Sequence, residues 1–302
     1  DNAPEFDILF HTWGEDEVTL QDVCDPQKDM ASMAGYSKFQ SVCKLARSHG
    51  YNYVWIDTCC IDKTSSAELS EAINSMFGWY EQASVSYAFL SDLSWPSDPG
   101  PGKKTAPLEM ALRGCRWFTR GWTLQELIAP DTVELYDKDW RLVGSKLDGS
   151  FATTLSSVTG IDLEVLNKTT PLESSSVAGR MHWASSRTTT RKEDMAYCLM
   201  GIFGVNMPLL YGEGMRAFTR LQGAILQETG DHSIFAWHSN RRKTSTQEAA
   251  LDQHVLSGLL APSPVEFSQF RHLRPLPALG TTGQQTIQLT NQGIRMSMYL
   301  EP

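Results

Sequence analysis

The sequence predicts an α/β fold, in which a mostly parallel sheet is covered by helices on both faces. Short apolar strands alternate with segments of helical periodicity through the first half of the chain. The apolar fraction of 41% supplies side chains for a core, and with 20% charged residues it excludes intrinsic disorder. The apolar runs are shorter than the roughly 18 residues that a membrane helix requires, so no membrane span is expected.

The first half supplies the elements of this sheet. Four short apolar runs are expected to form strands, at residues 6–10, 53–57, 85–90 and 132–136. Helical spacing of apolar residues predicts two longer helices at 36–49 and 68–82, and shorter ones at 108–113 and 122–127. Because helices separate the strands, the strands are expected to run parallel, with ligands bound beyond their carboxyl ends.

The second half has a different character and predicts further regions. Residues 147–228 are mainly helical in their periodicity, and residues 286–300 carry the signal of a hairpin around Asn291-Gln292-Gly293. We therefore expect an α/β core over 5–145, a helical extension packed on it over 146–240, and a β-rich tail over 241–302 that continues in a longer chain.

Charge and cysteine content narrow the class of protein. The net charge of −9 argues against a nucleic-acid partner, since such proteins normally carry a basic surplus. The six cysteines show no C-x-x-C spacing and fit free thiols in a reducing compartment. The first residues carry no signal peptide, which favours a cytoplasmic location. Zinc-site and phosphate-loop motifs are absent from the sequence, so neither a metal nor a bound cofactor is expected.

Polar side chains follow the ends of the predicted strands and are expected to meet at one edge of the sheet. They are His11 and Trp13 after the first strand, Asp57, Cys60 and Asp62 after the second, and Asp92 after the third. A ligand site is one interpretation of this arrangement. The alternative is that the aspartates cap helices and the tryptophan completes the core.

A second cluster of candidate residues lies at 116–127. Glu126 follows Trp122 by four residues and therefore shares its helical face. An acid beside tryptophans can sit in a half-buried pocket and serve catalysis. The alternative is a structural ion pair of Glu126 with Arg116 or Arg120.

Four segments resemble a known family. His11–Gly14, Trp55–Asp62 and Arg120–Leu127 resemble the three signature blocks of the fungal heterokaryon-incompatibility (HET) domain. Thr190–Phe203, continuing to Pro208–Gly214, is similar to the segment that follows this domain in many fungal members. The resemblance covers roughly residues 6 to 240.

Two positions depart from the family pattern. Phe10 stands where the family usually has Ser, and Lys63 stands where Gln is common. The family implies a cytosolic fungal self/non-self recognition protein whose activation triggers cell death. It also implies a core similar to the Toll/interleukin receptor (TIR) fold, a flavodoxin-like parallel sheet flanked by helices.

The resemblance to TIR domains also implies a chemistry. Enzymatic TIR domains carry a Trp-Cys-x-x-Glu-Leu helix whose glutamate cleaves NAD, and Trp122 and Glu126 have the same spacing. The implied activity is hydrolysis of NAD+ to nicotinamide and ADP-ribose, with Glu126 as the catalytic residue and NAD+ as substrate rather than cofactor. The residues expected to bind the substrate are His11, Trp13, Asp57, Cys60, Asp62, Arg120 and Trp122.

Two rival functions remain open. One is a non-enzymatic death adaptor, in which the same blocks build the fold and signalling proceeds through oligomeric contacts. The other is a cysteine hydrolase with Cys60 as nucleophile and His11 as base. The family also implies a homo-oligomer on activation and, in related chains, a C-terminal nucleotide-binding module with repeats. In the fourth block, Arg191, Glu193, Asp194 and Tyr211 are expected to form caps and ion pairs that lock the second half onto the first.

Overall fold

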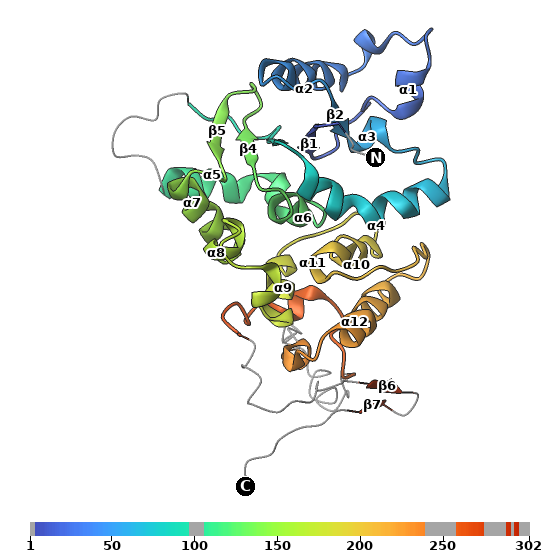
Figure 1. Ribbon diagram of the computed structural model, residues 1–302, viewed down its shortest axis with the longest axis vertical. Coiled ribbons are helices and arrows are strands. Elements are labelled where there is room, and N and C mark those ends of the chain that lie inside the picture. Colours follow the sequence, from blue (N-terminus) through green and yellow to red (C-terminus); the bar gives the residue numbers. More distant parts are fainter. Residues whose placement is uncertain (1–3, 97–105, 239–257, 275–287, 291–292, 296–302) are drawn as a thin grey trace, which may run out of the picture. The chain divides into compact units, whose positions relative to one another are not determined.

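The computed structural model contains two compact units, residues 1–171 and residues 172–302 (Figure 1). It describes residues 4–96, 106–238, 258–274, 288–290 and 293–295. The first unit includes helices α7 (Gly149–Thr159) and α8 (Leu163–Leu166). The expected three regions, with boundaries at 145 and 240, stay a prediction.

A five-stranded sheet forms the first unit, and it confirms the predicted α/β class. The strands lie in the order β2-β1-β3-β4-β5. They are β1 (Asp7–His11), β2 (Val54–Ile56), β3 (Ser86–Phe89), β4 (Val133–Tyr136) and β5 (Leu142–Ser145). The first four run parallel, and β5 pairs antiparallel with β4. Because β2 and β3 flank β1 on opposite sides, the direction of winding reverses at β1.

Helices cover both faces of this sheet, as the alternation of strands and helices predicts (Figure 1). Successive residues of β1 point to opposite faces. On one face Leu9 packs in a core with Val42 and Ala46 of α2 (Tyr36–Ser48). On the other, Phe10 makes an edge-to-face contact with Tyr80 of α4 (Ser66–Gln82), at 4.8 Å between ring centroids. Apolar side chains therefore bury the strands from both sides.

Shorter helices connect these elements. They are α1 (Leu20–Cys24), η1 (Met30–Ser32), α3 (Asp57–Cys60), α5 (Ala106–Gly114), η2 (Arg116–Thr119) and α6 (Thr123–Ile128). Every residue of α6 is buried, and the Gln125 amide donates a 3.8 Å hydrogen bond to the Met76 sulfur of α4. Helix α6 therefore lies inside the unit, beside α4.

The second unit is mainly helical, as the sequence predicts. Its elements are η3 (Leu172–Ser174), α9 (Val177–Ala184), α10 (Asp194–Tyr197), α11 (Met200–Phe203), α12 (Arg216–Glu228), η4 (His232–Phe235) and η7 (Pro264–Phe267). The antiparallel pair β6 (Gln288–Thr290) and β7 (Gly293–Arg295) confirms the hairpin. The rest of that predicted hairpin, at 286–287, 291–292 and 296–300, lies outside the described residues.

The fourth family block forms polar contacts inside this second unit. The Glu193 carboxylate accepts hydrogen bonds from the backbone N–H groups of Gly212 (2.9 Å) and Gly214 (2.8 Å). Both glycines have positive φ values, which favour glycine, so the loop takes a fixed path around this carboxylate. The Tyr211 hydroxyl donates to Asp194 at 3.0 Å. These bonds join segments of the second unit to one another.

In the described part of the chain, no helix is long and apolar enough to cross a bilayer.

Candidate functional site

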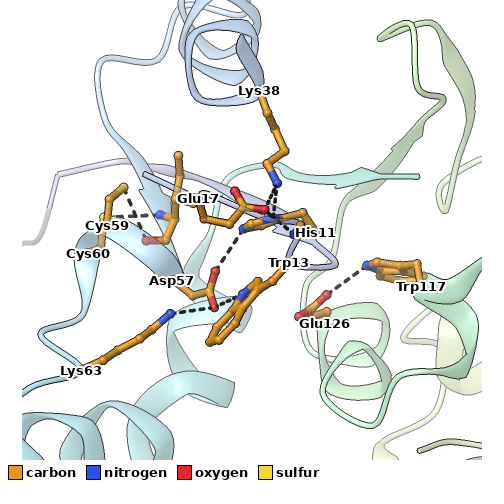
Figure 2. Close-up of polar contacts among 12 residues, drawn as sticks. His11, Trp13, Glu17, Lys38, Asp57, Cys59, Cys60, Lys63, Trp117 and Glu126 are labelled. Atoms are coloured by element: carbon orange, nitrogen blue, oxygen red, sulfur yellow. Dashed lines mark hydrogen bonds and ion pairs between the residues drawn. The ribbon is translucent and has the colours of Figure 1, made fainter. Parts of the chain in front are cut away.

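Of the predicted residues at the ends of β1 and β2, His11, Trp13 and Asp57 lie together (Figure 2). Leu9 is in register with Ile56, so His11 ends β1 close to the point where β2 passes into α3 at Asp57. The His11 Nε2 atom lies 3.2 Å from Asp57 Oδ1. The Trp13 indole N–H donates to Asp57 Oδ2 at 2.8 Å. Asp57 therefore contacts both His11, the last residue of β1, and Trp13, which follows the strand.

Two residues that the sequence did not single out complete the surroundings of His11. Lys38 of α2 places its Nζ 2.7 Å from His11 Nδ1 and 2.5 Å from Glu17 Oε1. An ammonium only donates, so Nδ1 acts as the acceptor and the ring proton sits on Nε2, where it faces Asp57. The chain of contacts Glu17–Lys38–His11–Asp57 thus favours one neutral tautomer of His11.

A sequence signal for Lys38 did exist. Lys38 precedes Val42 by four residues and Ala46 by eight, so it lies on the helix face that packs against the sheet. A lysine on an apolar helix face needs a buried partner, which points to a polar site under the helix.

Lys63 gives Asp57 a third neighbour. Its Nζ lies 3.6 Å from Asp57 Oδ2 and 3.7 Å from the centroid of the Trp13 ring. Burial opposes ionisation of Asp57, but the contacts with His11, Lys63 and Trp13 outweigh it and lower the pKa of this carboxyl. Burial also lowers the pKa of Lys63, although Asp57 opposes this shift. Asp57 with His11, Trp13 and Lys63 is called the Asp57 cluster below. Trp13 is 48% exposed, so this cluster presents one amphipathic ring to solvent.

The two adjacent cysteines have different environments. Cys59 is buried and Cys60 is exposed. The Cys60 sulfur accepts the Ile56 N–H at 3.3 Å. A hydrogen bond from the Cys59 thiol lowers the pKa of Cys60 to about 7, and the same contact raises the pKa of Cys59. Cys60 is therefore the more readily ionised thiol.

Two predicted aspartates serve the local structure. Asp62 accepts from the backbone N–H of Thr64 at 3.0 Å and from the Gln21 amide at 3.0 Å. Asp92 accepts the N–H of Arg116 at 2.8 Å, which caps the start of η2. Asp92 thus meets the first N–H of a helix, as the capping interpretation expects, whereas Asp62 bonds in the turn before α4, whose N-cap is Ser65. Substrate binding by Asp62 stays a prediction.

Glu126 lies on α6 and is 8% exposed. The Trp117 indole donates to Glu126 Oε2 at 3.1 Å, and Figure 2 shows the carboxylate turned toward that ring. Trp122, the tryptophan that helical spacing pairs with Glu126, directly precedes α6 and is half-buried. Arg120 is half-buried and Arg116 is exposed.

Tyr80 connects the two carboxylates of the region. Burial raises the pKa of its phenol well above the usual value, and the charges of Glu126 and Asp57 raise it further. The charge of each carboxylate therefore reaches the same hydroxyl, and Figure 2 shows Glu126 and the Asp57 cluster in one close-up of the first unit. Among the described residues, no group of three or more His, Cys, Asp or Glu side chains is arranged to hold a metal ion.

Comparison with known proteins adds to this picture. The family model "Heterokaryon incompatibility protein (HET)" matches residues 6–101, which include the whole Asp57 cluster. A domain of unknown function, DUF8212, matches residues 216–302. The chain is 45% identical over 230 residues to the vegetative incompatibility protein HET-E-1 of Podospora anserina. That match covers 75% of this chain and 16% of HET-E-1. No solved structure matches significantly.

Proposed function

The chain belongs to the family of heterokaryon incompatibility (HET) proteins, and we propose that its first unit hydrolyses NAD+ to nicotinamide and ADP-ribose. The observation that carries this proposal is the Glu126 carboxylate, held by Trp117 in the neighbourhood of the Asp57 cluster. Such hydrolysis in the cytoplasm would deplete NAD+ and kill the cell, as a role in vegetative incompatibility requires.

The reaction needs one well-placed carboxylate. Nicotinamide leaves a cationic ring as a neutral molecule, so no general acid is required. The developing charge lies on the ribose, which takes on oxocarbenium character as in glycoside hydrolysis. A preorganised carboxylate near the anomeric carbon stabilises that charge, and this is the role proposed for Glu126.

The Asp57 cluster supplies the proposed binding surface. Asp57 is held as a carboxylate by His11, Trp13 and Lys63, and its side chain is 23% exposed. Such a carboxylate can accept hydrogen bonds from ribose hydroxyls. The exposed indole of Trp13 suits stacking on nicotinamide or adenine. Arg120 or Arg116 would meet the pyrophosphate, and Cys60, Asp62 and Trp122 complete the proposed contacts.

The topology supports this location. The order β2-β1-β3-β4 is that of the first strands of flavodoxin-like sheets, in which ligands bind beyond the carboxyl ends near the reversal at β1. His11 lies at that end of β1. A TIR-like identity of this fold is part of the proposal.

A second function, a non-enzymatic death adaptor, is favoured by one observation. Glu126 is 8% exposed and bonded to Trp117, which is also what a purely structural carboxylate would show. A cysteine hydrolase is less well supported, because the two ring nitrogens of His11 contact Lys38 and Asp57 and neither is directed to Cys60.

The test is NAD+ consumption by the purified chain, concentrated enough to self-associate, with nicotinamide measured by chromatography. Glu126→Gln is compared with Glu228→Gln, a matched change at an exposed position. Loss of NAD+ with the native and Glu228→Gln chains alone supports the proposal. Equal loss of NAD+ with all three chains would show that Glu126 is not the catalytic residue. If none of the three chains consumes NAD+, although circular dichroism verifies folding and assembly is forced, the adaptor function is favoured.

The remaining proposals concern the whole protein. Since the chain spans 16% of HET-E-1, the complete protein is proposed to carry further modules, such as a nucleotide-binding domain with repeats. Activation is proposed to bring HET units together as a homo-oligomer in the cytoplasm.

A further inference from the structure

A buried lysine holds the carboxyl end of the helix that carries Glu126. Lys146 directly follows β5 and is 1% exposed. Its Nζ donates to the backbone carbonyls of Leu127 (3.0 Å), Ile128 (3.4 Å) and Pro130 (2.5 Å). The first two are carbonyls that a helix end leaves without partners inside the helix, and the third belongs to the residue after the C-cap Ala129.

A second lysine completes the set. Lys168 donates to the carbonyl of Ala129 at 2.7 Å. Every carbonyl from Leu127 to Pro130 therefore faces an ammonium group, at the end of the helix where positive charge is most favourable. The arrangement is specific, because three N–H donors of Lys146 meet three acceptors.

Helix α6 depends on such support. It has six residues, which is too short for a helix to be stable on its own. Glu126 directly precedes Leu127, so the main chain that sets its direction is the main chain that Lys146 holds. The Trp117 indole then fixes the far end of the same side chain.

We propose that Lys146 is a positioning residue for Glu126, which anchors the carboxyl end of α6 and so directs the Glu126 carboxylate to Trp117. Its effect on catalysis rests on the proposed NAD+ hydrolysis. Its effect on the carboxylate does not, and can be measured separately.

The charge of Lys146 supports this role and offers a probe. Burial, together with the charge of Lys168, lowers the pKa of Lys146 to about 7, and Asp131 opposes the shift. On losing its proton, the amine keeps two N–H donors for three carbonyls. The hydrogen bonds that anchor the carboxyl end of α6 should therefore weaken as pH rises through the pKa of Lys146.

The experiment follows the indole N–H signal of Trp117 by 15N NMR in the full chain, with Trp117→Phe used for assignment. In the native chain the signal should move with a midpoint near pH 7. In Lys146→Arg, which stays protonated, that transition should vanish, and this variant also separates the effect from titration of other groups. Lys146→Met should shift the signal at every pH. Lys168→Met, which removes the neighbouring cap, should keep a transition and move its midpoint to higher pH, because the charge of Lys168 lowers the pKa of Lys146.

Activity provides the second readout. If Glu126 cleaves NAD+, Lys146→Met should lower kcat by roughly ten- to a hundredfold at nearly unchanged KM, as misplacement of a catalytic group does. The same Trp117 signal in the native, Arg and Met chains at every pH overturns the proposal. A responsive signal in a chain that leaves NAD+ intact retains Lys146 as a positioning residue and removes the proposed reaction. Should Lys146→Met fail to fold, the native and Arg titrations decide alone.

Discussion

His11 and Asp57 are joined by a 3.2 Å contact between Nε2 and Oδ1, which ties the end of β1 to the start of α3. The two residues stand 46 positions apart in the chain. Asp57 also accepts from Trp13 and pairs with Lys63, so one carboxylate gathers the polar residues of this edge. Its charge should therefore matter both to stability and to ligand binding.

Asp57→Asn should destabilise the protein near neutral pH by about 1–3 kcal/mol, since His11 and Lys63 lose a charged partner. The neighbours lower the folded pKa of Asp57 below 3.8, so its contribution is present above that pH and is lost as pH falls through the folded pKa. Urea unfolding from about pH 7 to pH 3 measures this. The gap to the native chain should be constant above about pH 5 and narrow in acid.

The matched control is Asp139→Asn, at an exposed carboxylate paired with exposed Arg141. It should change stability by less than about 0.5 kcal/mol, as surface pairs do. A gap for Asp57→Asn that persists unchanged to the lowest pH would contradict the electrostatic account.

Lys38→Met should change the protonation of His11. In the native protein Lys38 donates to Nδ1 and thereby excludes a proton from it. Without the ammonium, Nδ1 faces Glu17 Oε1 at 3.7 Å while Nε2 still faces Asp57, and two carboxylates favour the imidazolium. The 15N chemical shifts of the ring at neutral pH distinguish the two forms. Lys44→Met, at an exposed position of the same helix, is the control; native shifts in Lys38→Met would show that Lys38 does not set the tautomer.

The arrangement around His11 shows what sequence patterns can and cannot supply. The four parallel strands are predictable because each is a short apolar run, and their shared direction brings His11, Trp13 and Asp57 together. Strand β5 escapes prediction because Leu142–Ser145 lies at the sheet edge, where exposed and half-buried residues leave no apolar run. Lys38 enters the site through packing of α2 on the sheet, to which its spacing from Val42 and Ala46 points. Glu17 enters it from the loop between β1 and α1, which carries no such spacing.

Glu126 illustrates the same limit at shorter range. Helical spacing pairs it with Trp122, but α6 begins only at Thr123 and its bonded indole comes from Trp117 in η2. A 3-10 segment followed by a turn has no fixed period that relates residues 117 and 126. Glu126 could be identified from the family motif, whereas its hydrogen-bond partner Trp117 could be identified only from the fold.

Trp117→Phe should separate the hydrogen bond to Glu126 from the packing of the ring. Phe retains most of the buried aromatic volume but donates nothing to Oε2. We expect a loss of about 1–3 kcal/mol in the free energy of unfolding, the usual cost of removing a buried hydrogen-bond partner plus some volume. If Glu126 is catalytic, kcat for NAD+ should fall as well. Trp140→Phe tests volume loss alone, since that indole stacks on Phe89; equal effects of the two changes would count against a special role for the Trp117 N–H.

Cys60 should be the thiol that iodoacetamide modifies first. It is exposed, and hydrogen bonding from Cys59 lowers its pKa to about 7, whereas the pKa of buried Cys59 is raised. Mass spectrometry after brief treatment should find Cys60 labelled and Cys59 not, with a rate that levels off above about pH 8. Cys60→Ser removes the label. If this variant also abolished turnover while Glu126→Gln did not, the cysteine hydrolase would replace the glutamate mechanism.

Lys146 should make the free energy of unfolding rise with pH in the alkaline range. Burial lowers its folded pKa to about 7, against 10.5 for the ordinary side chain. Between these values the unfolded chain binds more protons than the folded one, so the free energy of unfolding rises with pH, by up to about 1.4 kcal/mol per unit. Lys146→Met lacks this term and should show a flatter profile in urea unfolding from about pH 7 to pH 9.5. Cys60 contributes a rise of its own, which both chains share and which cancels in the comparison. Lys168→Met keeps Lys146 but removes a charge that lowers its pKa, so the rise should persist and begin at a higher pH. Parallel profiles for the native and Lys146→Met chains would mean that Lys146 stays charged throughout this range and that its three carbonyl partners outweigh its burial.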